Sequence, residues 1–257
     1  MLFAHRVNQI ANRFGIEIRR LVSNTATRTT LDEAYSHIRK LGLKPATVID
    51  VGVAKGTPEL YTNFPDAYYV LVEPLEVFEP YLKKVLKKYK GCYVLAAAGK
   101  CAGQVTFNVH DSHLEGSSLY KESMGDVADG HEIKVPVMTI DSIVADRRLS
   151  GPYLIKVDVQ GAELDVLDGC EDILNETEVV ALEVSMFQFM QDSPEFHDVV
   201  VYMKQKGFVA FDIIPGWNRP LDDSLGQVDI VFVREHGRFR DSHAYATVDQ
   251  LKSTFGE

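Results

Sequence analysis

Short continuous hydrophobic runs alternate with segments of helical periodicity from Thr47 onward. Runs without polar interruption are expected for strands that helices cover on both faces, so the pattern predicts a parallel sheet. An alternation of strands and crossover helices is typical of an α/β fold. The expected strands are Thr47–Val53, Tyr68–Glu73, Cys92–Ala97, Tyr153–Val159 and Val179–Val184. The expected helices are Pro58–Phe64, Phe78–Tyr89, Ala162–Leu174 and Glu195–Lys206.

Two segments depart from this alternation. An insertion at residues 104–140 holds two strand-like runs, Val105–Val109 and Ile133–Met138, joined by a long polar loop. We expect a hairpin whose loop contacts the substrate, since long loops in compact domains are usually functional. Phe208–Ile214 and Val228–Val233 follow each other without a helix and should pair antiparallel. The predicted fold is a Rossmann-like, doubly wound α/β sheet, mainly parallel with an antiparallel C-terminal strand, plus N-terminal helices and a β-hairpin insertion.

The same pattern divides the chain into a main domain at residues 46–240, a helical extension at 1–45 and a tail at 241–257. A helix is expected at Leu31–Leu41, because Gly42 and Pro45 follow in the usual order of helix-stop residues. Apolar residues and arginines alternate at helical spacing over Met1–Asn24. This segment is interpreted as a covering helix or arm, with contact to an anionic membrane surface or a partner as the alternative.

Composition narrows the class of protein. The 257 residues are 46% hydrophobic and 25% charged, which is ordinary for a folded globular domain. A net charge of −10 argues against a nucleic-acid partner, because phosphate backbones are bound by clustered lysine and arginine. No apolar run reaches the roughly 20 residues that span a bilayer, and a cytoplasmic location is expected. Three cysteines without CxxC spacing suggest neither disulfides nor a zinc site, and no pattern specifies an oligomeric state.

The first candidate for chemistry is the turn after the first predicted strand, in TVIDVGVAKG. Gly52 and Gly56 let the backbone approach a ligand closely, and Thr57 and Pro58 are typical of a helix start whose free N–H groups attract an anion. Asp50, at the strand end, could attract an amino group of the same ligand. A tight turn that binds nothing is the alternative, because glycine-rich turns are frequent in this architecture.

Glu73 ends the second predicted strand about 20 residues after Gly52, the spacing at which an acidic side chain accepts hydrogen bonds from ribose hydroxyls. This favours a cofactor with an adenosyl group. Nicotinamide dinucleotides and S-adenosylmethionine (SAM) share this arrangement. The turn reads G-x-x-x-G instead of G-x-G-x-x-G, because Ala54 stands where the dinucleotide fingerprint has glycine. SAM is therefore preferred, and an NAD-dependent oxidoreductase is the alternative.

A second polar group interrupts the fourth predicted strand. Lys156 and Asp158 lie two residues apart and so share one face near the edge where ligands bind. Glu183 interrupts the fifth strand in the same way. Buried charged groups need partners, so a structural Lys–Asp pair is the alternative to a catalytic one. Asp158 is the first candidate for a general base, and His110 or His113 of the insertion is the second.

Histidine at a hairpin edge is more often a surface residue, and no ligand spacing supports metal binding by His110, Asp111 and His113, so no metal site is expected. The only tryptophan, Trp217, lies in the last long loop, where it could stack on a sugar or cap the core.

Several blocks, in this order, resemble the FkbM-type methyltransferases. The resemblance spans about residues 47–233 and implies a SAM-binding Rossmann-like domain that methylates hydroxyl groups, often on sugars, glycan or glycolipid precursors, or polyketide natural products. The matching blocks are VIDVGVAKGT, VLVEP, GSSL, VMTIDSI and IKVDVQGAELDVLDG. The resemblance assigns Asp50, Gly52 and Gly56 to the cofactor turn, Glu73 to the ribose, and Lys156, Asp158, Gly161 and Glu163 to the motif beside the transferring methyl.

Ala97, at the end of the third predicted strand, and Ser118, in GSSL, complete the predicted cofactor site. The sequence departs from the family pattern at Gln160, where glutamate is usual, and at Val53-Ala54, where alanine and asparagine are usual. If the missing carboxylate only orients the turn, glutamine can hydrogen-bond in its place. If it acts as a base, the chain would be a catalytically silent SAM-binding module. The preferred hypothesis is a SAM-dependent O-methyltransferase acting on a small-molecule or glycan hydroxyl.

Overall fold

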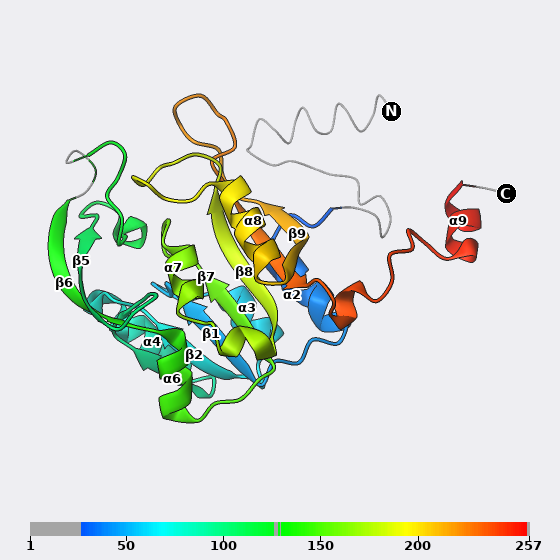
Figure 1. Ribbon diagram of the computed structural model, residues 1–257, viewed down its shortest axis with the longest axis horizontal. Coiled ribbons are helices and arrows are strands. Elements are labelled where there is room, and N and C mark those ends of the chain that lie inside the picture. The colour runs from blue at the N-terminus through cyan, green and yellow to red at the C-terminus, as the bar shows by residue number, and fades with distance from the viewer. Residues whose placement is uncertain (1–26, 126–127, 129, 256–257) are drawn as a thin grey trace, which may run out of the picture.

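The computed structural model describes residues 27–125, 128 and 130–255, and within them the chain forms a large and a small sheet with helices on both faces of the large one (Figure 1). The strands of the large sheet run in the order β3-β2-β1-β7-β8-β10-β9. Their bounds are β1 Thr47–Val51, β2 Tyr68–Val72, β3 Gly91–Val94, β7 Tyr153–Val157, β8 Thr177–Ser185, β9 Phe208–Pro215 and β10 Gln227–Arg234.

Strand β1 is an inner strand of the large sheet. It pairs parallel with β2 on one side and with β7 on the other, so the strand order reverses direction beside β1. Strand β10 lies antiparallel between β8 and β9. The predicted doubly wound, mainly parallel sheet with an antiparallel C-terminal strand is thereby confirmed. Ligands of such sheets bind at the carboxyl ends of the strands, at the point where the order reverses.

The two faces of the large sheet are covered by different helices. Helices α2 (Leu31–Lys40), α3 (Pro58–Asn63) and α4 (Glu79–Leu86) pack on one face, around the side chains of Val48, Leu154 and Val231. Helices α6 (Ile140–Arg147), α7 (Glu163–Asp168) and α8 (Phe196–Gln205) pack on the other, around Ile49, Ile155 and Ile230. Neighbouring residues of one strand therefore enter opposite cores, which explains the uninterrupted apolar runs.

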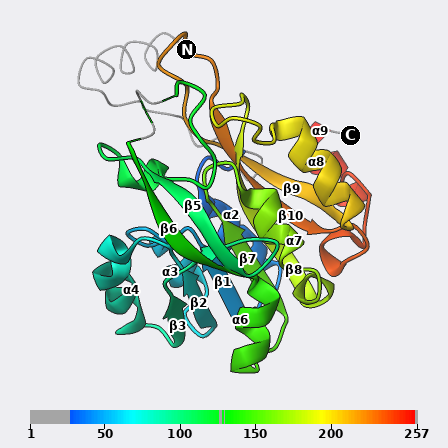
Figure 2. The same cartoon turned by 60° about the vertical axis from the view of Figure 1, so that its left-hand side comes forward.

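The insertion forms the small sheet beside the large one (Figure 2). Strands β5 (Gly103–Val109) and β6 (His131–Met138) pair antiparallel, as the sequence predicts. The predicted third strand is wrong in its extent, because β3 ends at Val94 and the chain continues to β4 (Ala97–Ala98), which pairs with β6. The apolar run continues through both strands, so the sequence does not reveal this change of partner.

Two helices also differ from the sequence prediction. Helix α7 ends at Asp168 instead of Leu174, and a Cβ on the following Gly169 would lie 2.3 Å from a backbone oxygen of Gly99. The sequence pattern does not predict helix α6, because polar and apolar residues are mixed in it in the same way as in the preceding strand β6. It begins at the Thr139 hydroxyl, which accepts a hydrogen bond from the amide of Ser142.

The ends of the chain are only partly described. The predicted helix after Thr30 is confirmed as α2, whose first turn is capped by the Thr30 hydroxyl, and Gly42 follows with φ +98°. The predicted amphipathic segment Met1–Asn24 lies outside the described residues. The tail contains helix α9 (Val248–Phe255). Among the described helices, none has the length and apolar character that crossing a membrane requires.

Within the described residues, four short 3₁₀ segments accompany these helices. Two of them lie close to the cavity described below: η2, which follows β2, and η3, which lies in the insertion loop after β5. The bounds are η2 Glu76–Phe78, η3 Leu114–Gly116, η4 Ile173–Glu176 and η5 Arg238–Arg240.

Candidate active site

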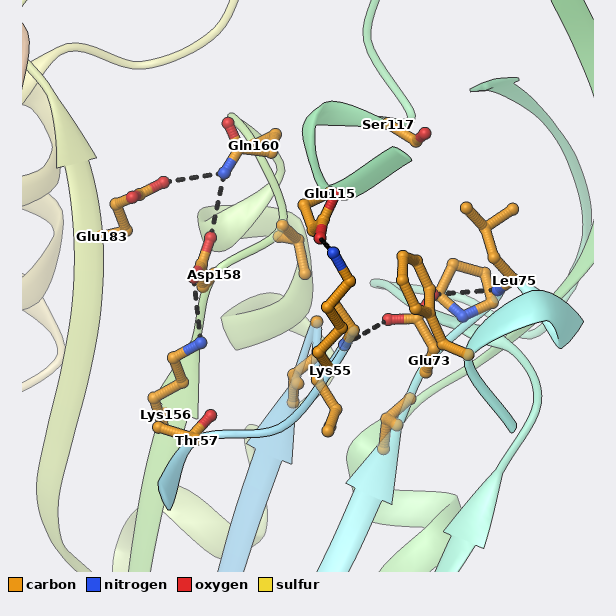
Figure 3. A pocket seen from close by; sticks show the side chains of 18 of the residues that line it. Lys55, Thr57, Glu73, Leu75, Glu115, Ser117, Lys156, Asp158, Gln160 and Glu183 are labelled. Carbon is orange, nitrogen blue, oxygen red and sulfur yellow. Dashed lines mark hydrogen bonds and ion pairs between the residues drawn. The ribbon is translucent and has the colours of Figure 1, made fainter. Parts of the chain in front are cut away.

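A cavity of about 520 Å³ lies at the carboxyl ends of β1, β2, β7 and β8 and at the amino end of the antiparallel β10, with the insertion above it (Figure 3). This is the edge at which the strand order reverses. Its size is that of a small-molecule site, since such pockets measure roughly 300 to 1,000 Å³. Of the predicted site residues, those that line the cavity are Gly52, Gly56, Glu73, Ala97, Lys156, Asp158 and His113.

The turn after β1 is shaped by a close backbone contact. Gly52 has φ +76°, and a Cβ at this position would lie 1.7 Å from the backbone oxygen of Asp158. Only glycine fits between the ends of β1 and β7. Ala54 also has a positive φ of 44°, a conformation that asparagine tolerates better than alanine. Alanine at this position, where asparagine is usual in the family, therefore places local backbone strain in the turn.

Glu73 holds this turn against the chain that follows β2 (Figure 3). Its side chain is almost fully buried, and one carboxylate oxygen accepts a 2.9 Å hydrogen bond from the amide of Ala54. The other oxygen accepts one of 2.9 Å from the amide of Leu75. Burial raises the pKa of Glu73, and these two bonds oppose that rise. A carboxylate has about four acceptor positions, so both oxygens can still accept hydrogen bonds from a ligand.

Glu73→Gln is expected to weaken binding of S-adenosylhomocysteine (SAH), the product form of the cofactor, about 10-fold or more. A glutamine has one acceptor oxygen, so its amide group would face one of the two backbone N–H groups, which costs about 1–3 kcal/mol. Calorimetric titration with SAH measures the effect. Glu76→Gln, at an exposed position three residues later, is the matched control. Equal SAH affinity in the Glu73 and Glu76 variants would contradict the assignment.

Asp50 lies behind the cavity wall. Its carboxylate is fully buried, accepts a 2.6 Å hydrogen bond from the Tyr61 hydroxyl and one of 3.3 Å from the Thr57 hydroxyl, and lies opposite Lys156 on the neighbouring strand. Burial raises the pKa of Asp50, and Lys156 opposes the rise. Asp50 thus fixes the start of α3 against β1. Thr57 holds the predicted N-cap position, but its hydroxyl binds Asp50 and does not cap the helix.

Lys156 and Asp158 form a 3.0 Å ion pair that faces the cavity. The exposed fraction is 7% for the lysine side chain and 31% for the aspartate side chain, so only the carboxylate is accessible to a ligand. Burial alone would lower the pKa of Lys156, but the charges of Asp158 and Asp50 raise it above its ordinary value. Burial alone would raise the pKa of Asp158, and Lys156 outweighs that effect and lowers it. The pair is therefore charged at neutral pH.

Gln160 connects this pair to a second carboxyl group (Figure 3). Its side-chain amide donates to Asp158 at 3.0 Å and to Glu183 at 2.8 Å. Gln227 donates to the same oxygen of Glu183 at 3.0 Å. An ionised glutamate at position 160 could donate neither bond. The glutamine therefore acts here as an orienting donor between two carboxyl groups.

Glu183 holds a proton at neutral pH. Burial, and next the negative charge of Asp158, raise its pKa to about 9 from an ordinary value of 4.5. The folded state thus keeps a proton that the unfolded state releases between these two values, so wild-type stability should fall as pH rises through that window.

Glu183→Gln is expected to remove this pH dependence, because glutamine resembles the protonated acid and does not titrate. The melting temperature of the variant relative to wild type should rise from about pH 5 to about pH 9. Thermal melts across that range measure it, with Glu76→Gln as the control. A constant difference between variant and wild type at all pH values would be evidence that Glu183 is ionised in the folded protein.

Five predicted site residues lie outside the cavity lining: Asp50, described above, and Gly161, Glu163, Ser118 and His110. The Glu163 carboxylate accepts 3.1 Å hydrogen bonds from the amides of Val159 and Gly161, which fixes the turn after β7, and burial raises its pKa to about 7. The Ser118 hydroxyl donates to the backbone oxygen of Gln160 at 2.7 Å, which ties the insertion to the same turn. His110 lies on the insertion beyond the cavity, whereas His113 lines it.

Apart from Ala97, sequence reasoning missed the residues of two parts of the cavity. An ion pair between Lys55 of the β1 turn and Glu115 of η3 crosses its mouth (Figure 3). An apolar wall lies between η2 and the small sheet. Neither feature has a sequence signal, since each joins segments that are distant in the chain. The residues of the apolar wall are Leu75, Phe78, Ala97, Phe107 and Leu119. Within the described residues, no three His, Cys, Asp or Glu side chains are grouped as metal ligands would be.

The fold and this cavity define an α/β protein with a small-molecule site at the edge of its sheet where the strand order reverses. The model of the methyltransferase FkbM domain matches residues 50–210, more than half of the chain. The chain belongs to this family and is a SAM-dependent methyltransferase, which confirms the resemblance seen in the sequence. The family decides between the two predicted cofactors in favour of SAM. No curated protein matches the chain.

Solved structures of several methyltransferases are similar at low identity. Magnesium protoporphyrin IX methyltransferase from Synechocystis PCC 6803 is 8% identical, with 91% of this chain and 85% of that chain covered and a TM-score of 0.45. Ribosomal protein L11 methylase from Lactobacillus delbrueckii subsp. bulgaricus is 12% identical, with 86% of each chain covered and a TM-score of 0.45. The family assignment rests on the family model and not on these structures.

The residues on the β1–β2 side of the cavity fit SAM. The buried Glu73 carboxylate would hold the ribose hydroxyls, and the turn from Gly52 to Gly56 leaves room for a backbone contact. The apolar wall beside η2 would take the adenine ring. When bound, SAM supplies an electrophilic methyl group.

Proposed function

We propose that the chain transfers the methyl group to a hydroxyl oxygen, on a sugar, glycan precursor or natural product. The observation that carries this proposal is the Asp158 carboxylate, which borders the cavity and is kept ionised by Lys156. An alcohol is a weak nucleophile until its proton is removed, and a carboxylate within hydrogen-bond reach is a suitable proton acceptor. Methylation of a neutral oxygen also requires that this proton leaves, so a nearby ionised base is needed.

The surrounding residues orient this base. Gln160 donates to one oxygen of Asp158 and Lys156 to the other, which restricts rotation of the carboxylate. Glu163 and Ser118 hold the turn on which Gln160 lies. Most of the rate can come from holding the acceptor oxygen close and aligned, and a fixed base contributes a further ~10²–10⁴-fold.

Lys156→Met is expected to move the acidic limb of the kcat/KM profile to higher pH by about 1 to 3 pH units. The lysine charge stabilises the ionised form of Asp158, so its removal raises the pKa of that carboxyl group. A larger fraction of Asp158 is then protonated at a given pH. A pH profile of methyl transfer measures the shift, with SAH affinity as the check on folding. An acidic limb at the wild-type position would mean that Asp158 is not the titrating base.

A screen of hydroxyl acceptors with methyl-labelled SAM tests the proposed function. Sugars, glycan precursors and cyclic natural products are offered to the purified chain, and the product is examined by NMR for a new O-methyl group. Transfer to oxygen is the expected result. Transfer to nitrogen or carbon would overturn the proposal, and SAH binding without transfer to any acceptor would indicate the catalytically silent module.

A further inference from the structure

The cavity continues beyond the residues assigned to SAM, toward β8, β10 and the loop between β9 and β10. Glu183 of β8 and Asp229 of β10 are direct neighbours in the sheet, and both line this part together with Trp217, Gln227 and Glu59. In the strand order β2-β1-β7-β8-β10, Glu73 follows β2 on one side of β7, and Glu183 and Asp229 lie on the strands of the other side. Glu59 reaches the cavity from α3. Asp158 follows β7 and therefore lies between the two halves of the cavity.

Trp217 is the main flat surface of the second half. Its side chain is 50% exposed, and the ring of Phe189 lies nearly parallel to it, at 10° and 6.1 Å between centroids. Its backbone oxygen accepts hydrogen bonds from the amides of Gly226, at 2.8 Å, and Gln227, at 3.3 Å. The indole is therefore a fixed and accessible wall of the cavity, and it does not cap the core.

Two of the carboxyl groups that line this part of the cavity are free hydrogen-bond acceptors. Among the described residues, the carboxyl groups of Glu59 and Asp229 have no hydrogen-bond or ion-pair partner. The two lysines that line the cavity in the described chain are both paired, Lys55 with Glu115 and Lys156 with Asp158. Unpaired carboxylates accept hydrogen bonds from hydroxyl groups. Because no unpaired lysine or arginine lines the cavity in the part of the chain that the structure describes, these carboxylates repel a phosphate or carboxylate on the ligand.

We propose that Trp217, Glu59 and Asp229 form the acceptor subsite, and that it takes an uncharged ring with several hydroxyl groups and excludes phosphorylated or carboxylated ones. The C–H face of such a ring packs on the indole, and its hydroxyl groups donate to the two carboxylates. A hydroxyl on the edge nearest β7 then lies toward Asp158. This inference rests on the proposed function, because it identifies where the acceptor binds.

Trp217 is the only tryptophan of the chain, so its fluorescence detects ligand binding at this subsite without an activity assay. The SAH-bound protein is titrated with a panel of uncharged methyl glycosides and cyclic polyols, and with the sugar 6-phosphates and uronic acids of the same rings. We expect a saturable change in emission with uncharged members and none with their anionic counterparts. Saturable binding of the anionic members, or no response to any uncharged one, would overturn the inference.

Variants locate the effect. Asp229→Asn should weaken binding of the responding glycoside about 10-fold, since a hydrogen bond to a charged carboxylate is stronger than one to a neutral amide. Trp217→Ala should lower kcat/KM for the acceptor about 10-fold or more and leave SAH affinity unchanged, and Trp217→Phe should restore most of the loss. Leu221→Ala is the matched control, because this side chain lies in the same loop, is 82% exposed and does not line the cavity.

Two results distinguish a failure of the subsite proposal from a failure of the proposed function. If an acceptor is O-methylated and Trp217→Ala leaves its kcat/KM unchanged, the subsite is wrong and the function stands. If a glycoside binds at Trp217 but the methyl group is found on nitrogen or carbon of the true acceptor, the O-methyltransferase proposal fails and the binding site stands.

Discussion

Asp158→Asn is expected to lower kcat for methyl transfer by about 10²–10⁴-fold at neutral pH, with SAH affinity unchanged. Asparagine keeps the size of the side chain and can still accept a hydrogen bond from Lys156. It cannot take the proton of the acceptor hydroxyl, so the contribution of the base is lost, and its amide group replaces the oxygen that accepts from Gln160. Single-turnover rates with a confirmed acceptor measure the chemical step, and calorimetry measures SAH binding.

The control for this variant is Asp146→Asn, which changes an exposed aspartate on α6, remote from the cavity lining. It should have wild-type kinetics. If Asp158→Asn retains more than a tenth of the wild-type rate, His113 becomes the stronger candidate, because it also lines the cavity. His113→Gln in the same assay then decides between the two.

The β1 turn and Glu73 could be predicted from the sequence because their signals are local. A strand, a glycine turn and an acid at the end of the next strand occupy one stretch of about 30 residues, and a parallel βαβ unit brings their ends together. The same holds for Lys156 and Asp158, which lie two residues apart on one strand. In each case the period of the strand determines which side chains share a face.

The position of Asp50 could not be predicted in the same way. It lies at the end of β1 beside the glycine turn, yet its carboxylate is fully buried behind the cavity wall. The Tyr61 hydroxyl that binds it comes from α3, and the orientation of that helix depends on packing against α2. The sequence shows that an acidic side chain is present, but not which neighbouring group donates a hydrogen bond to it.

The acceptor side depends on pairing between distant strands. Glu183 and Asp229 become neighbours only through the antiparallel register of β8 and β10, and a shift of one residue would move either side chain to the other face. Trp217 joins them because the β9–β10 loop folds back. No periodicity along one strand contains this information, which explains why the cofactor half of the site was easier to predict.

Gly52→Ala is expected to destabilise the protein by on the order of 3 kcal/mol and to weaken SAH binding about 100-fold or more. An alanine at φ +76° costs about 1–2 kcal/mol, and its Cβ would lie 1.7 Å from the backbone oxygen of Asp158, which forces the ends of β1 and β7 apart at a further cost of about 1–3 kcal/mol. Denaturant unfolding and calorimetry with SAH measure the two effects.

The matched control is Gly103→Ala, because a Cβ at Gly103 would meet nothing within 4 Å and its φ is not positive. If Gly52→Ala does not fold, Gly56→Ala is the milder test, since its φ is +106° but its Cβ would make ordinary contacts of 3.5 Å or more. Wild-type stability and SAH affinity in Gly52→Ala would contradict the close approach of the two strands.

The close approach of β1 and β7 also couples cofactor binding to catalysis. The backbone oxygen that a Cβ at Gly52 would meet belongs to Asp158, the proposed base. A displacement there should lower kcat by more than the loss of SAH occupancy explains, and kinetics at saturating SAM separate these contributions.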